Sequence, residues 1–260
     1  MKYTLVVKDD HFSKHVAKEL NTKLQALDMI YDHIQPQMVI TVGGDGTMLK
    51  AVHQYMNSIN EVVFVGVHTG KLGFYTDFTH DELDSFINKI AQGEFVDVSF
   101  PLLKASVCNN NGCVLYNALN EFTLINPYHT QHIDVYINDH YFESFQGTGL
   151  CISTPTGSSA FNKSLGGALI HPKIKAFQLT EIASINSNVY RTIISPMIFP
   201  KEHTITLKAT DFREVILTID HMHRNIDRYD YIKFELSDQV VRFRHYNNND
   251  FWRRVQKAFL

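Results

Sequence analysis

Met38-Val39-Ile40-Thr41-Val42-Gly43-Gly44-Asp45-Gly46-Thr47 is the stretch of sequence that decides the fold. Its apolar first half is typical of a buried strand, and Met48–Met56 beyond it has the spacing of a helix. A glycine-rich connection between a buried strand and a helix predicts an α/β unit. Backbone N–H groups and the helix dipole at such a turn favour a bound phosphate.

The same alternation continues on both sides of this loop. Strands are predicted at Tyr3–Val7 and Val62–Val67, and helices at His11–Leu27 and Asp81–Ile90. Strands that alternate with helices indicate a parallel sheet covered by helices. We therefore expect residues 1–100 to form an α/β domain with a mainly parallel sheet.

Beyond Pro101 the hydrophobic period changes to two, which is typical of half-buried strands. Ile133–Ile137 and Tyr141–Phe145, for example, flank the turn pair Asn138-Asp139. One helical interruption is predicted at Ser158–Leu165. Residues 101–240 are expected to form a β-rich, sandwich-like domain.

The C-terminal segment, residues 241–260, is expected to return to the first domain. It ends in a predicted helix, for which Asp250 is a suitable N-cap. We expect Phe251 and Trp252 of this helix to pack in the core.

Composition excludes several classes of protein. A net charge of −3 and 20% charged residues do not indicate a nucleic-acid surface. The longest aliphatic run, Val62–Val67, is far too short for a membrane helix, and the N-terminus lacks a signal peptide. We expect a soluble cytoplasmic protein that binds neither membrane nor nucleic acid.

The three cysteines, Cys108, Cys113 and Cys151, show no zinc or disulfide spacing. Cys108 and Cys113 flank a predicted hairpin turn, Asn109-Asn110-Asn111-Gly112, and could face each other across two strands. Two reduced thiols are nevertheless the favoured interpretation, which fits a reducing compartment.

Asp45 is an unusual residue for a phosphate loop, because a carboxylate repels phosphate. A carboxylate is expected there if it binds a metal ion or accepts the proton of a hydroxyl group. The alternative is that Asp45 only caps the helix. The loop is neither a Walker A loop nor a dinucleotide fingerprint. By itself it predicts an ATP-dependent kinase of a small hydroxyl substrate.

This loop resembles the Gly-Gly-Asp-Gly-Thr loop of the superfamily of NAD kinases, diacylglycerol and sphingosine kinases, and phosphofructokinases. The rest of the chain, from Met38 onward, resembles the NAD kinases, and most closely the short bacterial ones of Gram-positive type. The further segments that carry this resemblance are Gly66–Phe74, Asn120-Glu121, Gly147–Gly167, Ile185–Pro196, Asp220-His221 and Phe251–Arg254.

The resemblance implies phosphorylation of the adenosine ribose 2′-hydroxyl of NAD by ATP, with Mg²⁺ or another divalent cation. Asp45 would be the catalytic base, and NAD would lie between the domains of a homodimer or homotetramer. The ATP phosphates would be bound by Gly43, Gly44, Gly46 and Thr47. The implied NAD-binding residues are Asp45, Gly46, Phe74, Asn120, Glu121, Gln146, Thr148, Thr156, Ser159, Ala160, Phe161, Asn162, Ser164, Ala183, Ile185 and His221.

Several of these residues suit the ligand on chemical grounds. Asn120 offers a donor and an acceptor to an adenine edge, and an ionised Glu121 could accept from a ribose hydroxyl. The hydroxyl-rich turn Thr156–Ser164 suits a ribose and a pyrophosphate. A plain strand-end turn and ordinary helix capping are the alternatives. His221 could contact phosphate, whereas two histidines, His221 and His223, do not make a metal motif.

The sequence departs from the family pattern at three positions. Thr148 stands where the family has the aspartate of Gly-Asp-Gly, Gln146 replaces a basic residue, and Phe161 replaces a tyrosine. Two alternative functions stay open: a non-catalytic dinucleotide-binding protein, or another small-molecule or lipid kinase of the same superfamily.

Overall fold

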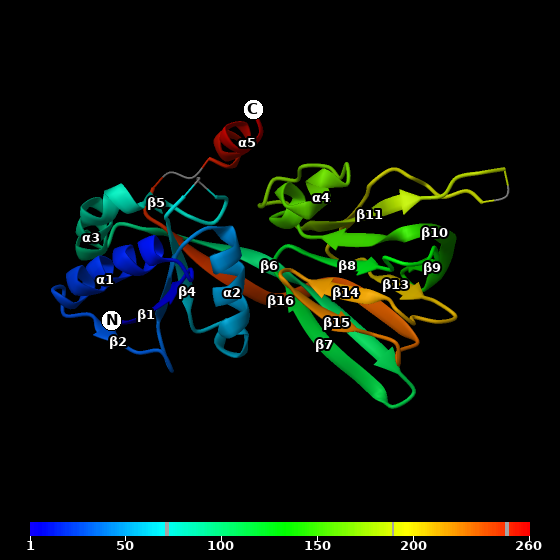
Figure 1. Ribbon diagram of the computed structural model, residues 1–260, viewed down its shortest axis with the longest axis horizontal. Coiled ribbons are helices and arrows are strands. Elements are labelled where there is room, and N and C mark those ends of the chain that lie inside the picture. Colours follow the sequence, from blue (N-terminus) through cyan, green and yellow to red (C-terminus); the bar gives the residue numbers. More distant parts are fainter. Residues whose placement is uncertain (71–72, 189, 248–249) are drawn as a thin grey trace. The chain divides into compact units, whose positions relative to one another are not determined.

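The computed structural model describes residues 1–70, 73–188, 190–247 and 250–260. The chain divides into two compact units, which are drawn in Figure 1. Unit 1 comprises Met1–Phe100 and Gln239–Leu260, and unit 2 comprises Pro101–Asp238. Two long strands, β6 (Val96–Asn109) and β16 (Tyr231–His245), each contribute residues to both units.

Unit 1 contains a parallel sheet with the strand order β16-β4-β3-β1-β2, and β5 pairs with β4. Every residue of β3 and β4 is buried, as expected for central strands with both faces covered. The predicted α/β class is therefore confirmed. The strands confined to this unit are β1 (Lys2–Val7), β2 (Ile30–Tyr31), β3 (Met38–Val42), β4 (Val63–His68) and β5 (Phe78–Thr79).

The helices of unit 1 follow the strands as the alternation predicts. Leu20 and Leu24 of the first helix and Phe86 of the third are buried in one core with the sheet and Tyr246. The second helix begins at Asp45 rather than at the predicted Met48, which places Asp45 in its first turn. The helices are α1 (His11–Gln25), α2 (Asp45–Gln54), α3 (Leu83–Gln92) and α5 (Phe251–Phe259), with short 3₁₀ turns η1 (Met56–Ser58) and η2 (His80–Glu82).

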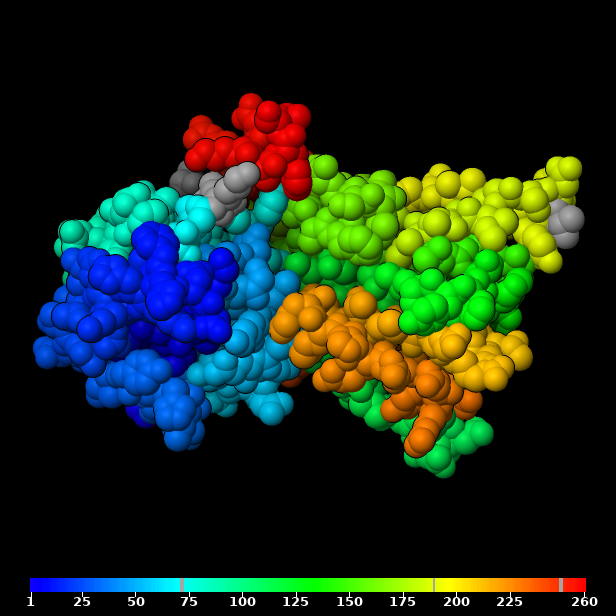
Figure 2. Space-filling view, viewed as in Figure 1, coloured from blue at the N-terminus to red at the C-terminus, as the bar shows by residue number. Residues whose placement is uncertain are grey.

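The C-terminal helix α5 lies on the surface of unit 1 (red in Figure 2). Asp250 caps it by accepting hydrogen bonds from the N–H groups of Trp252 (2.8 Å) and Arg253 (3.3 Å). The expectation of a buried Trp252 is wrong, since 53% of this residue is exposed. The inward face instead carries Phe251 and Arg254, three positions apart, which is the spacing of one helical turn.

Unit 2 is built from antiparallel pairs in the order β15-β14-β8-β10-β9-β13-β16, with β11 beside β10 and β12, and β6 beside β16 and β7. Its core is a single cluster of aliphatic and aromatic residues from these strands. The predicted β-rich class of this part is confirmed. The further strands are β7 (Gly112–Ala118), β8 (Glu121–Ile125), β9 (Gln131–Ile137), β10 (His140–Ser153), β11 (Ala176–Ser184), β12 (Met197–Pro200), β13 (Ile205–Lys208), β14 (Ile216–Ile219) and β15 (Met222–Asn225).

Two local predictions in unit 2 agree with the structure. Asn138 and Asp139 join β9 to β10 with positive φ angles of 49° and 65°, as a tight hairpin turn requires. The helical interruption consists of a 3₁₀ turn, η3 (Gly157–Ser159), and a one-turn helix, α4 (Phe161–Ser164).

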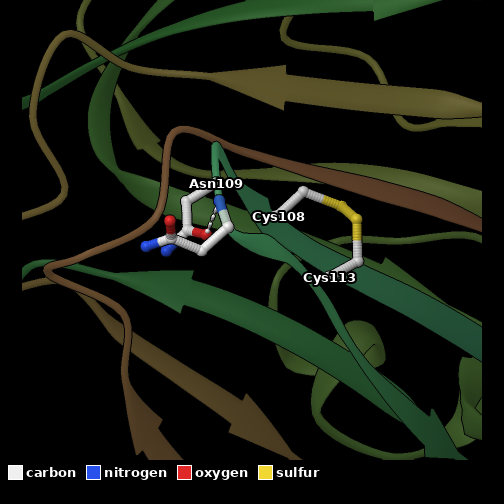
Figure 3. The surroundings of a disulfide bond; sticks show 4 residues. Cys108, Asn109 and Cys113 are labelled. Atoms are coloured by element: carbon white, nitrogen blue, oxygen red, sulfur yellow. Dashed lines mark hydrogen bonds between the residues drawn. A yellow bond between two sulfur atoms is a disulfide. The ribbon is translucent and has the colours of Figure 1, made fainter.

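The hairpin of β6 and β7 holds a disulfide bond between Cys108 and Cys113, which are paired across the two strands (Figure 3). The side chain of Asn109 accepts a hydrogen bond from the N–H of Asn111 at 2.9 Å and so supports the turn. The expectation of two reduced thiols at Cys108 and Cys113 is therefore wrong, because the tight turn brings them opposite each other. Cys151 is a buried free thiol.

In the described ranges, no helix has the length and apolar character needed to cross a membrane.

Candidate active site

The glycine loop joins the end of β3 to the start of α2. A Cβ atom on Gly43 would lie 2.2 Å from Oγ1 of the buried Thr47, so only glycine fits there. Gly44 is the N-cap of α2, and no side chain in the described part of the chain caps this helix. An uncapped helix start leaves N–H groups that need an acceptor, and an anion such as phosphate satisfies them.

The carboxylate of Asp45 is held by two backbone N–H groups from outside its own loop. Phe74 donates to Oδ2 at 2.9 Å and Tyr75 donates to Oδ1 at 3.1 Å. Gly73 lies so close that a Cβ atom on it would be 2.2 Å from Oδ1 of Asp45. These contacts fix the orientation of the carboxylate, and they connect the first predicted loop to the second. Lys71 and Leu72 of the second loop lie outside the described residues.

A pocket of about 460 Å³ opens beside this loop, at the carboxyl ends of three neighbouring parallel strands. In parallel α/β sheets, ligands bind at this edge. Two lysines, Lys8 and Lys50, contribute positive charge, and Lys8 also pairs with Asp10 at 3.1 Å. The pocket is lined by Val7, Lys8, Asp9, Gly44, Gly46, Thr47, Lys50, Thr69 and Gly70.

Neither lysine was among the residues predicted from the sequence. Lys8 directly follows the first strand, and this position could have placed it at the same edge of the sheet as the glycine loop. Lys50 lies on α2 one turn beyond Thr47 and therefore on the same face of the helix.

In unit 2, the turn that carries Asn120 and Glu121 is held by Asp220. The carboxylate of Asp220 accepts hydrogen bonds from the N–H groups of Leu119 (2.9 Å), Asn120 (2.7 Å) and Glu121 (3.2 Å). Asp220 lies in the tight turn between β14 and β15, with a φ of 51°. Asp220, which was predicted as part of the pair Asp220-His221, thus holds the turn that carries the predicted pair Asn120-Glu121.

The hydroxyl-rich segment packs on the same turn. Oγ1 of Thr154 donates to the carbonyl of Leu119 at 2.6 Å, and Oγ1 of Thr156 donates to the same carbonyl at 3.0 Å. A Cβ atom on Gly157 would lie 2.2 Å from the carbonyl oxygen of Asn120, so the two segments touch through backbone atoms. The fold therefore brings together two motifs that are far apart in the sequence.

Glu121 is buried, with 8% of the residue exposed, and its Oε2 atom has no hydrogen-bond partner among the described residues. Burial, and to a lesser extent the charge of Asp220, raise the pKa of Glu121 from 4.5 to about 8. At neutral pH the carboxyl group is therefore mostly protonated. It can then donate as well as accept, whereas the sequence led us to expect only an ionised acceptor.

Within the segment 156–164, Asn162 is fully buried. Its Oδ1 accepts from Oγ1 of Thr180 at 2.8 Å, and its amide packs where a Cβ atom on Gly167 would be. These contacts anchor the segment to β11. Of its neighbours, Thr156 and Ser159 are buried, Ala160 is half-buried, and Phe161 and Ser164 are exposed.

Four further predicted residues of unit 2 lie on β10, on β11 or directly after β11. The buried Gln146 accepts a hydrogen bond at its backbone oxygen from the N–H of Ile185 at 2.8 Å. Ala183 has a φ of 47°, and both Ala183 and Ile185 are exposed. The half-buried Thr148 uses its carbonyl to accept from Asn126 and Gln131, at 3.0 and 2.6 Å.

Two predicted positions remain. His221 is exposed next to Asp220, in the turn between β14 and β15. In unit 1, Phe74 packs against Phe251 and Phe259 of α5, with ring centroids 6.2 and 5.9 Å apart. The predicted segment Ile185–Pro196 also contains Val189, which lies outside the described residues.

A fixed carboxylate beside a pocket at a helix start of an α/β unit fits the class of kinases that act on a small hydroxyl substrate. The chain belongs to the ATP-NAD kinase family. The ATP-NAD kinase N-terminal domain matches residues 3–95, and the ATP-NAD kinase C-terminal domain matches residues 119–245.

Individual relatives agree over the whole chain. NAD kinase 1 of Listeria innocua serovar 6a is 44% identical over 265 residues, which cover 100% of this chain and 99% of the relative. The NAD kinase of Staphylococcus carnosus is 42% identical over 266 residues, which cover 100% of this chain and 98% of the relative.

Solved structures share the fold at lower sequence identity. Yeast NADH kinase complexed with NADH superposes with a TM-score of 0.86 at 20% identity, covering 98% of this chain and 86% of that one. An NAD kinase from Archaeoglobus fulgidus in complex with ATP gives a TM-score of 0.78 at 20% identity, with 99% of both chains covered.

Proposed function

We propose that this chain transfers the γ-phosphoryl group of ATP to the 2′-hydroxyl of the adenosine ribose of NAD, giving NADP and ADP. The observation that carries the proposal is the carboxylate of Asp45, fixed by two N–H groups in the first turn of α2 and next to the pocket. In the reaction, the 2′-oxygen bonds to the γ-phosphorus, the bond from that phosphorus to the β–γ bridging oxygen breaks, and Asp45 takes the hydroxyl proton.

Phosphoryl transfer depends mainly on positioning and on neutralising charge, so a weak but well-oriented base is sufficient. The ATP phosphates would be bound at the loop of Gly43, Gly44, Gly46 and Thr47, by the N–H groups of Gly44 and Gly46 and the hydroxyl of Thr47. The N–H of Gly43 donates to the carbonyl of Val67 at 2.9 Å, so Gly43 would contribute by shaping the loop. Lys8 and Lys50 would neutralise part of the phosphate charge.

A divalent cation, Mg²⁺ for example, is part of the proposal as a companion of ATP. In the described part of the chain no group of three or more His, Cys, Asp or Glu side chains is arranged to hold a metal ion. Both oxygens of Asp45 already accept N–H hydrogen bonds. Since Mg²⁺ is commonly carried by substrate phosphates, it would enter as MgATP rather than reside in the protein.

For NAD, Asn120, Glu121 and Thr156 form the best-supported set, because one turn holds them together and the Oε2 atom of Glu121 lacks a partner among the described residues. The buried Asn162 would act mainly by anchoring the segment 156–164 to β11, through its hydrogen bond with Thr180. Gln146, Thr148, Ala183 and Ile185 would form a second set on β10, on β11 and directly after β11. A cytoplasmic location and a homodimer or homotetramer also belong to the proposal.

The test is to incubate the purified chain with NAD and MgATP, and to measure NADP with an NADP-specific dehydrogenase together with ADP. Equal amounts of NADP and ADP are expected. Tight NAD binding without NADP would overturn the proposal in favour of a binding protein. Phosphoryl transfer to diacylglycerol or sphingosine, but not to NAD, would overturn it in favour of another kinase of the superfamily.

A further inference from the structure

The short segment 73–77 of unit 1 is held from two sides. On one side, the N–H groups of Phe74 and Tyr75 donate to Asp45. On the other side, the carbonyl oxygen of Gly73 accepts a hydrogen bond of 2.6 Å from Nη1 of Arg254 on α5. Arg254 and Asp45 are therefore connected through the backbone of two consecutive residues.

Arg254 is a buried cation, with only 8% of the residue exposed. Its second nitrogen, Nη2, donates to Oδ1 of Asp77 at 3.2 Å, and the side chain of Asp77 is 2% exposed. The planar guanidinium thus binds both ends of the segment 73–77 at once, through two different nitrogen atoms. A lysine has a single nitrogen and does not reproduce this geometry.

Asp77 is itself fixed by the chain that leads into α5. It accepts hydrogen bonds from Nδ1 of His245 at 2.8 Å and from the N–H of Tyr246 at 3.2 Å. Burial lowers the pKa of Arg254, while the negative charges of Asp77 and Asp45 oppose this effect, so Asp45 lies within electrostatic reach of the guanidinium.

The geometry around Asp45 leaves little room for the segment to move. A Cβ atom on Gly73 would lie 2.2 Å from Oδ1 of Asp45, so the backbone is already in close contact with the carboxylate. The rings of Phe251 and Phe259 of α5 pack against Phe74 from the side of the helix. A displacement of this segment relative to Asp45 would alter both hydrogen bonds that Phe74 and Tyr75 donate to its carboxylate.

We propose that Arg254 is a positioning residue for Asp45: by binding Gly73 and Asp77, it holds the N–H groups of Phe74 and Tyr75 where they orient the catalytic carboxylate. The inference rests on the proposed function, in which Asp45 is the base. The C-terminal helix is then part of the catalytic apparatus without touching the substrates.

The competing interpretation is that Arg254 only attaches α5 to unit 1. The two interpretations differ in their kinetic consequences. Misplacing a catalytic group by about 1 Å can cost roughly 100-fold in rate. We therefore expect Arg254→Gln and Arg254→Lys to reduce kcat by roughly 10- to 100-fold, with KM for NAD and for ATP changed by less than about threefold.

Arg253→Gln is the matched control, because Arg253 is an exposed arginine next to Arg254 on the same helix. It should behave like the wild-type protein. Arg254→Lys keeps a charge in the buried position and serves as the test variant if Arg254→Gln does not fold.

The decisive measurement is a double-mutant cycle with Asp45→Asn. If Arg254 acts through Asp45, Arg254→Lys should lower the residual rate of Asp45→Asn by less than about threefold, because the group that it positions is already lost. Equal fold losses in the two backgrounds would overturn the proposal and leave only the structural role.

Hydrogen exchange of the ligand-free protein tests the same contact without any enzyme assay. In Arg254→Lys the amides of Phe74 and Tyr75 should exchange at least about tenfold faster than in the wild-type protein, whereas the amides of β3 should be unchanged. Unchanged exchange at both positions would overturn the proposal. Failure of the wild-type protein to form NADP would instead refute the proposed function, which separates the two failures.

Discussion

The carboxylate of Asp220 accepts a hydrogen bond of 2.7 Å from the backbone N–H of Asn120, a residue one hundred positions earlier in the chain. The same carboxylate binds the N–H groups of Leu119 and Glu121. A single side chain thus determines the conformation of the turn that presents the proposed NAD-binding pair. Charge-assisted hydrogen bonds of this kind are stronger than neutral ones.

Asp220→Asn should weaken NAD binding and lower the free energy of unfolding, because an amide cannot accept from three N–H groups as a carboxylate does. A charged hydrogen bond contributes about 1.5–3 kcal/mol, so a loss of this order is expected in both quantities. NAD titration and denaturant unfolding measure it. Asp227→Asn, at an exposed aspartate of the same unit, is the control. An Asp220→Asn titration that overlays the wild-type curve would contradict the role of Asp220.

Glu121 should make stability depend on pH. Its pKa is about 8 in the folded protein, against 4.5 ordinarily, so the folded state binds more protons than the unfolded state between these values. The stability that the protonated Glu121 contributes is therefore fully present below about pH 4.5, and it is lost as the pH rises through about 8. Since one pKa unit corresponds to about 1.4 kcal/mol, the free energy of unfolding of Glu121→Gln relative to the wild-type protein should be higher at pH 8 than at pH 5, by on the order of 3–4 kcal/mol.

Denaturant unfolding of both proteins at pH 5, 6.5 and 8 measures this difference. The Glu121→Gln variant removes the titrating group but keeps its size, so the difference between the curves isolates Glu121. Parallel pH profiles of the two proteins would show that Glu121 is ionised in the folded state, contrary to this account.

Lys50 should contribute to the binding of ATP and not of NAD. It lines the pocket beside the glycine loop, where its ammonium can approach a phosphate. A charge contact at such an open position contributes about 1 kcal/mol, so Lys50→Ala should raise KM for ATP by roughly fivefold with the dissociation constant of NAD unchanged. Lys18→Ala, on the exposed surface of α1, is the control. If KM for ATP does not change, the pocket does not receive the phosphates.

Thr148→Asp should tighten the binding of NAD. The neighbouring glycines are packed closely, since a Cβ atom on Gly149 would lie 1.9 Å from the carbonyl oxygen of Leu124, so position 148 sits on a rigid backbone. A carboxylate there can accept charge-assisted bonds, and a gain of about 1 kcal/mol corresponds to roughly fivefold in affinity. Thr148→Asn, with the same size and no charge, should gain less. Unchanged or weaker binding by Thr148→Asp would mean that this position does not face the ligand.

The sequence was most informative where a local pattern determines the structure. The apolar run Met38–Val42 is β3 with the predicted limits, and the period of two beyond Pro101 corresponds to the antiparallel strands of unit 2. The glycines around Asp45 indicated a close backbone approach, and the contact between Gly43 and Thr47 explains one of them. Each of these features depends on residues that are neighbours in the chain.

The roles of Asp220 and Arg254, which the sequence did not reveal, depend on contacts between distant residues. Asp220 and Arg254 are ordinary charged residues in their own segments, and only the fold shows that they bind the turn 119–121 and the segment 73–77. Hydrophobicity alone favoured burial of Trp252, but the helix turns this side outward and Arg254 inward. The disulfide of Cys108 and Cys113 follows from the pairing register of one hairpin; the predicted turn allowed the two cysteines to face each other, but cysteine spacing favoured reduced thiols.

The rate of ATP-dependent NADP formation by the wild-type protein and by Asp45→Asn, at saturating NAD and MgATP, tests the central claim most directly. The substitution keeps the size of the side chain but removes the base, and loss of a general base typically costs about 10²- to 10⁴-fold in rate. We predict a loss of kcat in this range, with NAD affinity within a few-fold of wild type. An Asp45→Asn variant that binds NAD normally and turns over at the wild-type rate would contradict the account.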